Sequence, residues 1–218
     1  MIFDMATLPP QDRYKIMTAT IVPRPIAWIT TLSRDGVLNA APFSFFNMMG
    51  NDPPTVAIGI MPKAGLLKDT AANILETGEF VVNLVAEADA SAMNLTCIDA
   101  PPEVDELALA ELEAAASRFV APPRIRTARV AFECQALTSL VTGPLQTIVI
   151  GRVLCAHVED RFVQDAERCH IDTPALELIA RMHGGEAYLR TSDLFHLKRP
   201  SWAEWRGPTP RDESAATT

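Results

Sequence analysis

The sequence predicts a mainly β fold, an antiparallel barrel with peripheral helices. About seven apolar or alternating segments of strand length follow one another, and tight turns join most of them. Few helical segments separate the strands, which disfavours a doubly wound parallel sheet. The 218 residues suit one domain. We expect this domain over residues 1–205 and a flexible polar tail over residues 206–218.

The expected strands rest on composition and on the turns between them. Asp35-Gly36 is a strong hairpin signal. Pro23 and Pro25 force residues 20–25 to be extended. Strands are predicted over residues 27–32, 37–46, 55–61, 80–85, 129–141, 146–158 and 193–198.

Helices are expected between some of these strands. Asp69 or Thr70 can cap a helix that ends at Gly78. Residues 105–118 are rich in Ala, Leu and Glu, which predicts a strongly amphipathic helix. A Thr-Pro pair, a cap followed by a first-turn proline, predicts another helix over residues 173–183. A short helix or a turn is predicted over residues 9–14, and a short helix over residues 88–95.

Charge and composition exclude several classes of partner. The net charge of −8 and the pI of about 5.0 disfavour a nucleic-acid or anionic-membrane surface. Apolar runs are shorter than the roughly 18 residues of a membrane span, and the N-terminus lacks the basic start of a signal peptide. Four scattered cysteines without a CxxC pair indicate reduced thiols. We therefore expect a cytoplasmic protein that binds neither nucleic acid nor membrane.

Familiar phosphate-binding, hydrolytic and metal motifs are missing. The sequence holds no GxGxxG, no GxxxxGK[ST] and no GxSxG, which disfavours a Rossmann site, a P-loop and a nucleophile elbow. His157, His170, His183 and His196 have no metal-ligand spacing, so we predict no metal site.

Residues 39–47 are the most informative stretch. Two Asn, a Pro and a Ser interrupt a region that otherwise has the composition of a buried strand. Buried polar groups need partners, and small side chains leave backbone N–H and C=O groups free to lie against a flat, heteroatom-rich ring. The stretch therefore predicts a site for a planar cofactor.

A basic loop that leads into a helix predicts an anion site. Helix N-termini present free N–H groups and the positive end of a dipole. Lys63 and Lys68 would add charge, and Thr70 and Asn73 would add neutral donors on one helix face. The alternative is ordinary capping with solvated lysines.

An ordered set of segments resembles one known family over about residues 12–200. No single segment is diagnostic, but the set in this order and spacing is fairly specific. The segments are Arg24-Pro25-Ile26-Ala27-Trp28-Ile29-Thr30-Thr31, residues 36–46, Asp52-Pro53-Pro54, residues 68–73, residues 80–84, Gly151-Arg152-Val153, Tyr188 and Arg199-Pro200. They resemble the flavin reductase-like, FMN-binding split-barrel family.

The resemblance implies an antiparallel split barrel that forms a homodimer with FMN, rather than FAD, at the subunit interface. It implies that NAD(P)H is a candidate reductant and that hydride moves through flavin N5, so the cofactor and no catalytic side chain carries the chemistry. The lysines and the helix start would hold the phosphate, in agreement with the anion-site argument. The implied cofactor contacts are Thr30, Thr31, Asn39, Ala41, Pro42, Phe43, Ser44, Phe45, Lys63, Lys68, Thr70 and Asn73.

One position departs from the pattern of the pyridine-nucleotide-dependent members. These often have a His five residues before the Gly of the Gly-x-Val strand, where this chain has Gln146. Gln can hydrogen-bond a nicotinamide or a ribose, but it has no titratable charge. Three functions stay open: an NAD(P)H-dependent flavin oxidoreductase, a flavin-binding electron carrier without its own nicotinamide site, and a flavin-free binding module.

Overall fold

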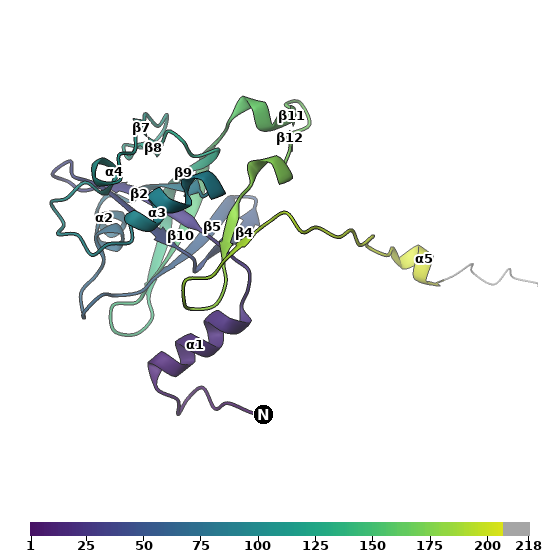
Figure 1. The fold of residues 1–218 in the computed structure, drawn as a ribbon, viewed down its shortest axis with the longest axis horizontal. Helices are drawn as coiled ribbons and strands as arrows, with labels where there is room; N and C mark the ends of the chain where they lie inside the picture. The colour runs from purple at the N-terminus through teal and green to yellow at the C-terminus, as the bar shows by residue number, and fades with distance from the viewer. Residues whose placement is uncertain (207–218) are drawn as a thin grey trace, which may run out of the picture.

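The computed structural model describes residues 1–206, and its centre is a seven-stranded antiparallel sheet (Figure 1). The sheet order is β3-β2-β6-β9-β10-β5-β4. Contacts of β3 with β5, and of β1 with β4, close the sheet into a barrel. The strands are β1 (Arg24–Pro25), β2 (Ala27–Leu32), β3 (Leu38–Phe43), β4 (Phe46–Asn51), β5 (Pro54–Ile60), β6 (Glu79–Leu84), β9 (Val130–Val141) and β10 (Thr147–Val158).

Six of the seven predicted strands are confirmed, and one of these six is divided into two shorter strands. The segment predicted as a single strand over residues 37–46 is interrupted at Ser44 and Phe45. Before this corner β3 pairs with β2, and after it β4 pairs with β5. The corner therefore carries the chain from one side of the split in the barrel to the other.

Two helices differ from their predictions in detail. The first, α1 (Pro10–Thr20), is longer than the predicted 9–14. In the second, α2 (Asp69–Thr77), Gly78 ends the helix in a left-handed conformation as predicted, but Lys68 occupies the cap position and makes no side-chain cap bond. The predicted cap by Asp69 or Thr70 is therefore wrong, because both are helical residues and Thr70 points into the protein. The next helical segment is η1 (Glu87–Asp89) followed by α3 (Ala90–Leu95).

The predicted helix over residues 105–118 is wrong. Only one turn forms, α4 (Glu106–Leu109), capped by Asp105, whose Oδ1 accepts from the amides of Leu107 and Ala108. Glu111 then has a left-handed backbone (φ 54°), which ends the helix. The chain continues into a small ladder of β7 (Ala114–Ala115) with β8 (Arg124–Ile125). Helix propensity is a weak prior, and tertiary pairing overrides it here.

The C-terminal third corrects two more predictions. The predicted helix 173–183 is a single 3₁₀ turn, η3 (Pro174–Leu176), followed by β13 (Ile179–Arg181), which pairs with β1 and with β14 (Tyr188–Arg190). The amide of Ile179 bonds to the carbonyl of Val85, which draws the segment onto the barrel. The predicted strand 193–198 pairs with no strand among the described residues. The remaining elements are η2 (Asp160–Phe162), β11 (Val163–Asp165), β12 (His170–Ile171) and α5 (Trp202–Arg206).

The two largest buried clusters hold the barrel and its helices together. Ile29, Ile58 and Phe80 belong to the larger one, formed by barrel strands and α2. Trp28 and Leu107 belong to the second, which packs α3 and α4 against the barrel. Among residues 1–206, no helix is both long and apolar enough to cross a membrane. The predicted tail lies, from residue 207 on, outside the described residues.

Candidate functional site

Three cavities follow one another along residues 39–45, which comprise most of β3 and the two residues after it. The first has a volume of about 330 Å³, the second about 690 Å³ and the third about 630 Å³. The first and second share Pro42, and the second and third share Ser44. The predicted contacts that line them, in order, are Asn39, Ala41, Pro42, Phe43, Ser44 and Phe45.

The first cavity collects the predicted anion-binding residues. Lys63, Lys68 and Thr70 line it, beside the start of α2. The first amides of a helix have no partner within the helix, and no side chain caps this one at Lys68. The Lys63 ammonium is paired with Asp99 at 2.8 Å, and the Lys68 ammonium lies 5.7 Å from the centre of the Phe43 ring. The cavity therefore has two cations at one helix start, one of them already paired.

A buried hydrogen-bond network forms the back of this cavity. The Thr70 hydroxyl donates to Oδ1 of Asn39 at 2.7 Å, and the Asn73 side-chain amide donates to the Thr31 hydroxyl at 3.0 Å. The Nδ2 of Asn39 donates to both carboxylate oxygens of Glu106 at 3.2 and 3.1 Å. The network joins β2, β3, α2 and α4, and so fixes the wall of the cavity.

Three predicted contacts lie behind the cavity walls. Thr30, Thr31 and Asn73 do not line any of the three cavities. Thr30 is fully buried, and its hydroxyl donates to the carbonyl of Pro123 at 2.6 Å. The structure therefore places these residues as supports of the wall, and their direct contact with a cofactor stays a prediction.

Glu106 is a residue that the sequence analysis missed. Asp105 and Glu106 have the composition of a solvated helix face, but Glu106 is buried and lines the first cavity. Burial raises the pKa of its carboxyl, the amide of Ala40 and the side chain of Asn39 oppose this by hydrogen bonding, and the charge of Asp69 raises the pKa further. No local pattern distinguishes this carboxylate from its exposed neighbours, since its partners are about 66 residues away in sequence.

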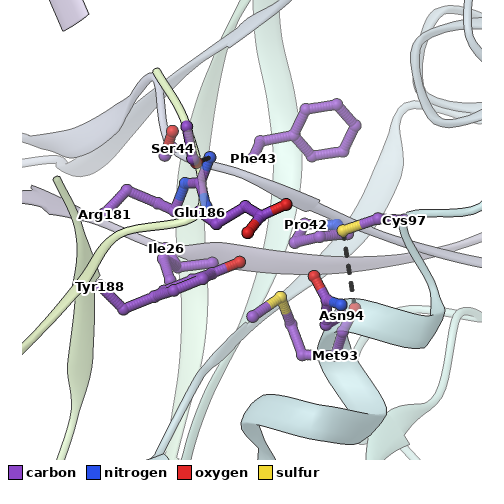
Figure 2. A pocket seen from close by; sticks show the side chains of 11 residues that line it. Ile26, Pro42, Phe43, Ser44, Met93, Asn94, Cys97, Arg181, Glu186 and Tyr188 are labelled. Atoms are coloured by element: carbon purple, nitrogen blue, oxygen red, sulfur yellow. Dashed lines mark hydrogen bonds between the residues drawn. The ribbon is translucent and has the colours of Figure 1, made fainter. Parts of the chain in front are cut away.

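The second cavity lies between a hairpin and a helix (Figure 2). Arg181 and Tyr188 come from β13 and β14, and the guanidinium lies 4.6 Å from the centre of the Tyr188 ring. Glu186, in the loop between these strands, lines the same cavity. Asn94 and Cys97 approach from the side of α3. Burial raises the pKa of the Cys97 thiol, and Arg181 and Lys68 lower it by smaller amounts. The wall thus offers flat, apolar and hydrogen-bonding surfaces, which suits a planar heteroaromatic ring.

The third cavity is mainly apolar. It lies between α1 and the strands β4, β5 and β10, and Tyr14, Met17 and Met61 are among its lining residues. Gln146, the predicted substrate contact, lines this cavity together with Ser44. The predicted substrate contact thus shares a cavity with the end of the predicted cofactor segment.

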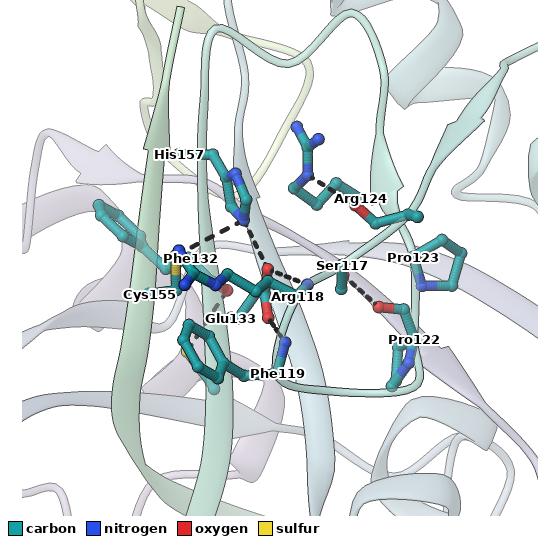
Figure 3. A network of polar contacts seen from close by, with 12 residues as sticks. Ser117, Arg118, Phe119, Pro122, Pro123, Arg124, Phe132, Glu133, Cys155 and His157 are labelled. Atoms are coloured by element: carbon teal, nitrogen blue, oxygen red, sulfur yellow. Dashed lines mark hydrogen bonds and ion pairs between the residues drawn. The ribbon is translucent and has the colours of Figure 1, made fainter.

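A separate polar cluster lies outside the three cavities (Figure 3). Glu133 is fully buried and accepts hydrogen bonds from the amides of Arg118 and Phe119 at 2.7 and 2.6 Å and from His157. Burial alone raises the pKa of Glu133, but these hydrogen bonds together lower it below its usual value. The Cys155 Sγ lies near this pair: one such atom from each of Glu133, Cys155 and His157 falls within 4.8 Å of the others. No sequence pattern predicts this cluster, in which Glu133 holds the 117–119 loop to the barrel.

Comparisons with known proteins agree with this fold. A family model described as a flavin reductase like domain matches residues 18–172. An uncharacterized protein of Deinococcus radiodurans is 42% identical over 209 residues, which cover 94% of this chain and 92% of the relative. Nitrilotriacetate monooxygenase component B from Bacillus cereus is 33% identical with a TM-score of 0.85, over 90% of this chain and 98% of its own. Pseudomonas fluorescens 2-nitrobenzoate 2-nitroreductase is 30% identical with a TM-score of 0.84, and the match covers 96% of this chain and 100% of the nitroreductase. The chain therefore belongs to the flavin reductase-like family and has its split-barrel fold.

Proposed function

We propose that the protein binds FMN along residues 39–45 and acts as an NAD(P)H-dependent flavin oxidoreductase. The observation that supports this best is the row of three cavities along residues 39–45, in which neighbouring cavities share a lining residue, with two lysines and a helix start at one end. A phosphate suits the first cavity, a planar ring suits the second, and a second substrate suits the third.

The residues present fit such a cofactor. Lys63, Lys68 and the first amides of α2 supply donors to one phosphate. One anion site at a cavity of about 330 Å³ favours FMN over the larger, two-phosphate FAD. The acidic side chains of Asp69, Asp99 and Glu106 also line this cavity, so the lysines must outweigh them when phosphate binds.

When bound, FMN supplies the redox chemistry by accepting hydride at N5, and the protein supplies position and electrostatics. Pro42 and Ser44 line the second cavity and would orient a ring that lies against residues 39–45. Gln146 donates to or accepts from the amide of a nicotinamide in the third cavity. Arg181 and Glu186 place one positive and one negative charge at the second cavity, and the guanidinium of Arg181 would stabilise negative charge on a ring held there.

We also infer that the active form is a homodimer with FMN at the interface. Exposed apolar side chains on β4 and on or just after α1 support this: Met17, Ile21, Met48 and Met49 are between 49% and 68% exposed.

Two relatives support the oxidoreductase, and one residue of this chain favours a second candidate. The names of the Bacillus cereus and Pseudomonas fluorescens proteins describe a monooxygenase component and a nitroreductase. The second candidate is a flavin-binding electron carrier that a partner reduces, which Gln146 favours because it replaces the His found in many pyridine-nucleotide-dependent members. A flavin-free binding module is the third candidate.

One absorbance experiment separates the three. The purified protein is titrated with FMN, FAD and riboflavin, and the loaded protein is then mixed anaerobically with NADH or NADPH. Tight FMN binding with bleaching of the flavin band by either nucleotide supports the oxidoreductase. Binding without bleaching supports the carrier, and failure to take up any flavin supports the binding module.

A further inference from the structure

Three side chains with metal-binding atoms converge in the cluster of Glu133, Cys155 and His157 (Figure 3). The Nε2 atom of His157 lies 3.7 Å from the Cys155 Sγ and also contacts Oε1 of Glu133. One ring nitrogen thus faces both other groups, whereas a relay from thiol through imidazole to carboxylate would use both ring nitrogens. None of the three residues lines the three cavities along residues 39–45. The arrangement therefore indicates a common point of coordination outside the candidate flavin site.

A β-bulge creates this convergence. β9 and β10 pair antiparallel, and the register shifts between Val153 and Cys155, so that Leu154 is the extra residue. Cys155 consequently lies directly opposite Glu133. His157, two residues further along β10, lies on the same side of the strand as Cys155 and is a diagonal neighbour of Glu133. Bulges re-aim side chains and are frequent next to active sites, and this one brings Cys155 into the cluster.

The three ligand types suit Zn²⁺. Proteins bind this ion through thiolate, imidazole and carboxylate groups, most often with tetrahedral geometry. Bonds of about 2.0–2.3 Å then place the ligand atoms about 3.3–3.6 Å apart. The distance of 3.7 Å between Cys155 Sγ and His157 Nε2 is close to this spacing, and the contact of Nε2 with Glu133 would open to admit the ion. A divalent cation also neutralises the two negative charges of a thiolate and a carboxylate.

The surroundings of the cluster support a ligand role for the carboxylate. Glu133 is fully buried, and its two oxygens accept from the amides of Arg118 and Phe119 at 2.7 and 2.6 Å. Outer hydrogen bonds of this kind fix the direction of a ligating group. Cys155 is partly buried and the His157 side chain is 27% exposed, so water can reach the cluster as a fourth ligand.

We propose that Glu133, Cys155 and His157 bind one Zn²⁺ ion, with water as the fourth ligand. The ion joins β9 to β10 at the bulge and, through Glu133, stabilises the loop that carries Arg118 and Phe119. The spacing of the histidines alone predicts no metal site, because the ligands come from two strands that only the fold brings together. This inference goes beyond the proposed function and does not require flavin.

Titration with Co²⁺ tests the ligand set. The full chain is stripped with a chelator and titrated with Co²⁺, whose bond to a thiolate gives a charge-transfer band in the near ultraviolet. We expect the band to saturate at one Co²⁺ per chain and to disappear when Zn²⁺ is added. Cys155→Ser should abolish the band, and His157→Gln should raise the dissociation constant at least about tenfold. Cys169→Ser and His170→Gln change an exposed Cys-His pair outside the cluster and are the matched controls, which should bind like the wild type.

Melting curves separate loss of the ion from misfolding. An ion that binds only the folded chain raises the melting temperature as its concentration increases. We expect Zn²⁺ to do so for the wild type and both controls, and not for Cys155→Ser or His157→Gln, whose melting temperatures in chelator report misfolding. Flavin uptake is measured on the same samples. Absence of flavin with an intact cobalt band would contradict the proposed function and leave the zinc site supported.

Alkylation followed by mass spectrometry tests the site without any variant. Zn²⁺ should slow the reaction of bromoacetamide with Cys155 at least about tenfold and leave that of the exposed Cys169 unchanged. Equal protection of both thiols, or of neither, would overturn the proposal. So would a wild-type protein without a cobalt–thiolate band, or a band that survives in Cys155→Ser, and the contact of Glu133 with His157 would then be a support of the loop alone.

Discussion

The side chain of Asn39 is held by Glu106: its Nδ2 lies 3.2 and 3.1 Å from the two carboxylate oxygens. This contact decides which way the Asn39 amide faces, so that its Oδ1 is left to accept from Thr70 at 2.7 Å. A carboxylate 67 residues away thus positions the strand that lines the cavities.

Glu106→Gln should change how stability depends on pH. Burial raises the pKa of Glu106 above its ordinary value of 4.5. The folded protein then binds more protons than the unfolded chain between these two values, so the contribution of Glu106 is complete below about pH 4.5 and is lost as the pH rises through the raised pKa. We expect the difference in unfolding free energy, wild type minus Glu106→Gln, to shrink as the pH rises. Urea unfolding at a series of pH values measures it.

The size of this effect has a physical bound. A shift of one pKa unit corresponds to about 1.4 kcal/mol. The variant also replaces one carboxyl oxygen by an NH₂ group, so the Ala40 amide or the Asn39 amide loses an acceptor, which costs about 1–3 kcal/mol in addition. A difference that stays constant with pH would show that Glu106 has the same pKa in the folded and the unfolded protein.

Lys68→Met should weaken FMN binding without affecting riboflavin. FMN and riboflavin differ by the phosphate alone, and Lys68 lines the cavity at the start of α2. Charge-assisted hydrogen bonds contribute about 1.5–3 kcal/mol, so the dissociation constant for FMN should rise about tenfold or more. Fluorescence titration measures both ligands. Lys15→Met, an exposed lysine on α1, is the matched control, and equal weakening of both ligands by Lys68→Met would place the phosphate elsewhere.

Asp99→Asn should tighten FMN binding. The Asp99 carboxylate neutralises Lys63 at 2.8 Å in the first cavity. Both side chains are substantially exposed, and such pairs are worth about 0–1 kcal/mol. Freeing the lysine should therefore lower the dissociation constant for FMN by at most about fivefold. Calorimetric titration with FMN and riboflavin checks this, and a gain shared equally by riboflavin would argue against a phosphate beside Lys63.

The barrel and the segment 39–45 could be predicted because their signals are local. Alternating apolar residues and the Asp35-Gly36 turn lie within single elements, and the small residues of the segment stand out from the strands around them. Glu106 could not be predicted, since its burial is decided by Asn39 on another element. The same holds for β13, which becomes a strand because Ile179 bonds to the chain after β6.

The sequence predicts part of the cavity walls, and what these walls bind stays a prediction. The residues expected along 39–45 do line the three cavities, but the opposite wall of the second cavity comes from the β13–β14 hairpin, where Arg181 and Tyr188 meet. That stretch was expected to be partly helical, so nothing in its pattern placed it beside the cavity. The predicted strand 193–198 is the reverse case, because Phe195 and Leu197 alternate with His196 and Lys198 in the sequence, but no strand among the described residues pairs with this segment.

Gly151→Ala should destabilise the barrel. Gly151 lies on β10 over Phe80, a fully buried residue of the inner core, and a Cβ at this position would overlap the tip of the Phe80 ring. The ring is enclosed by the barrel, so either it or the strand must shift, which costs about 1–3 kcal/mol. Gly185→Ala is the matched control, since nothing lies within 4 Å of its added Cβ. Denaturant unfolding of both variants, and of Gly151→Ala combined with Phe80→Leu, measures the effect. The shorter Leu should recover part of the loss caused by Gly151→Ala, and a double variant whose losses simply add would show that the Phe80 contact is not the cause.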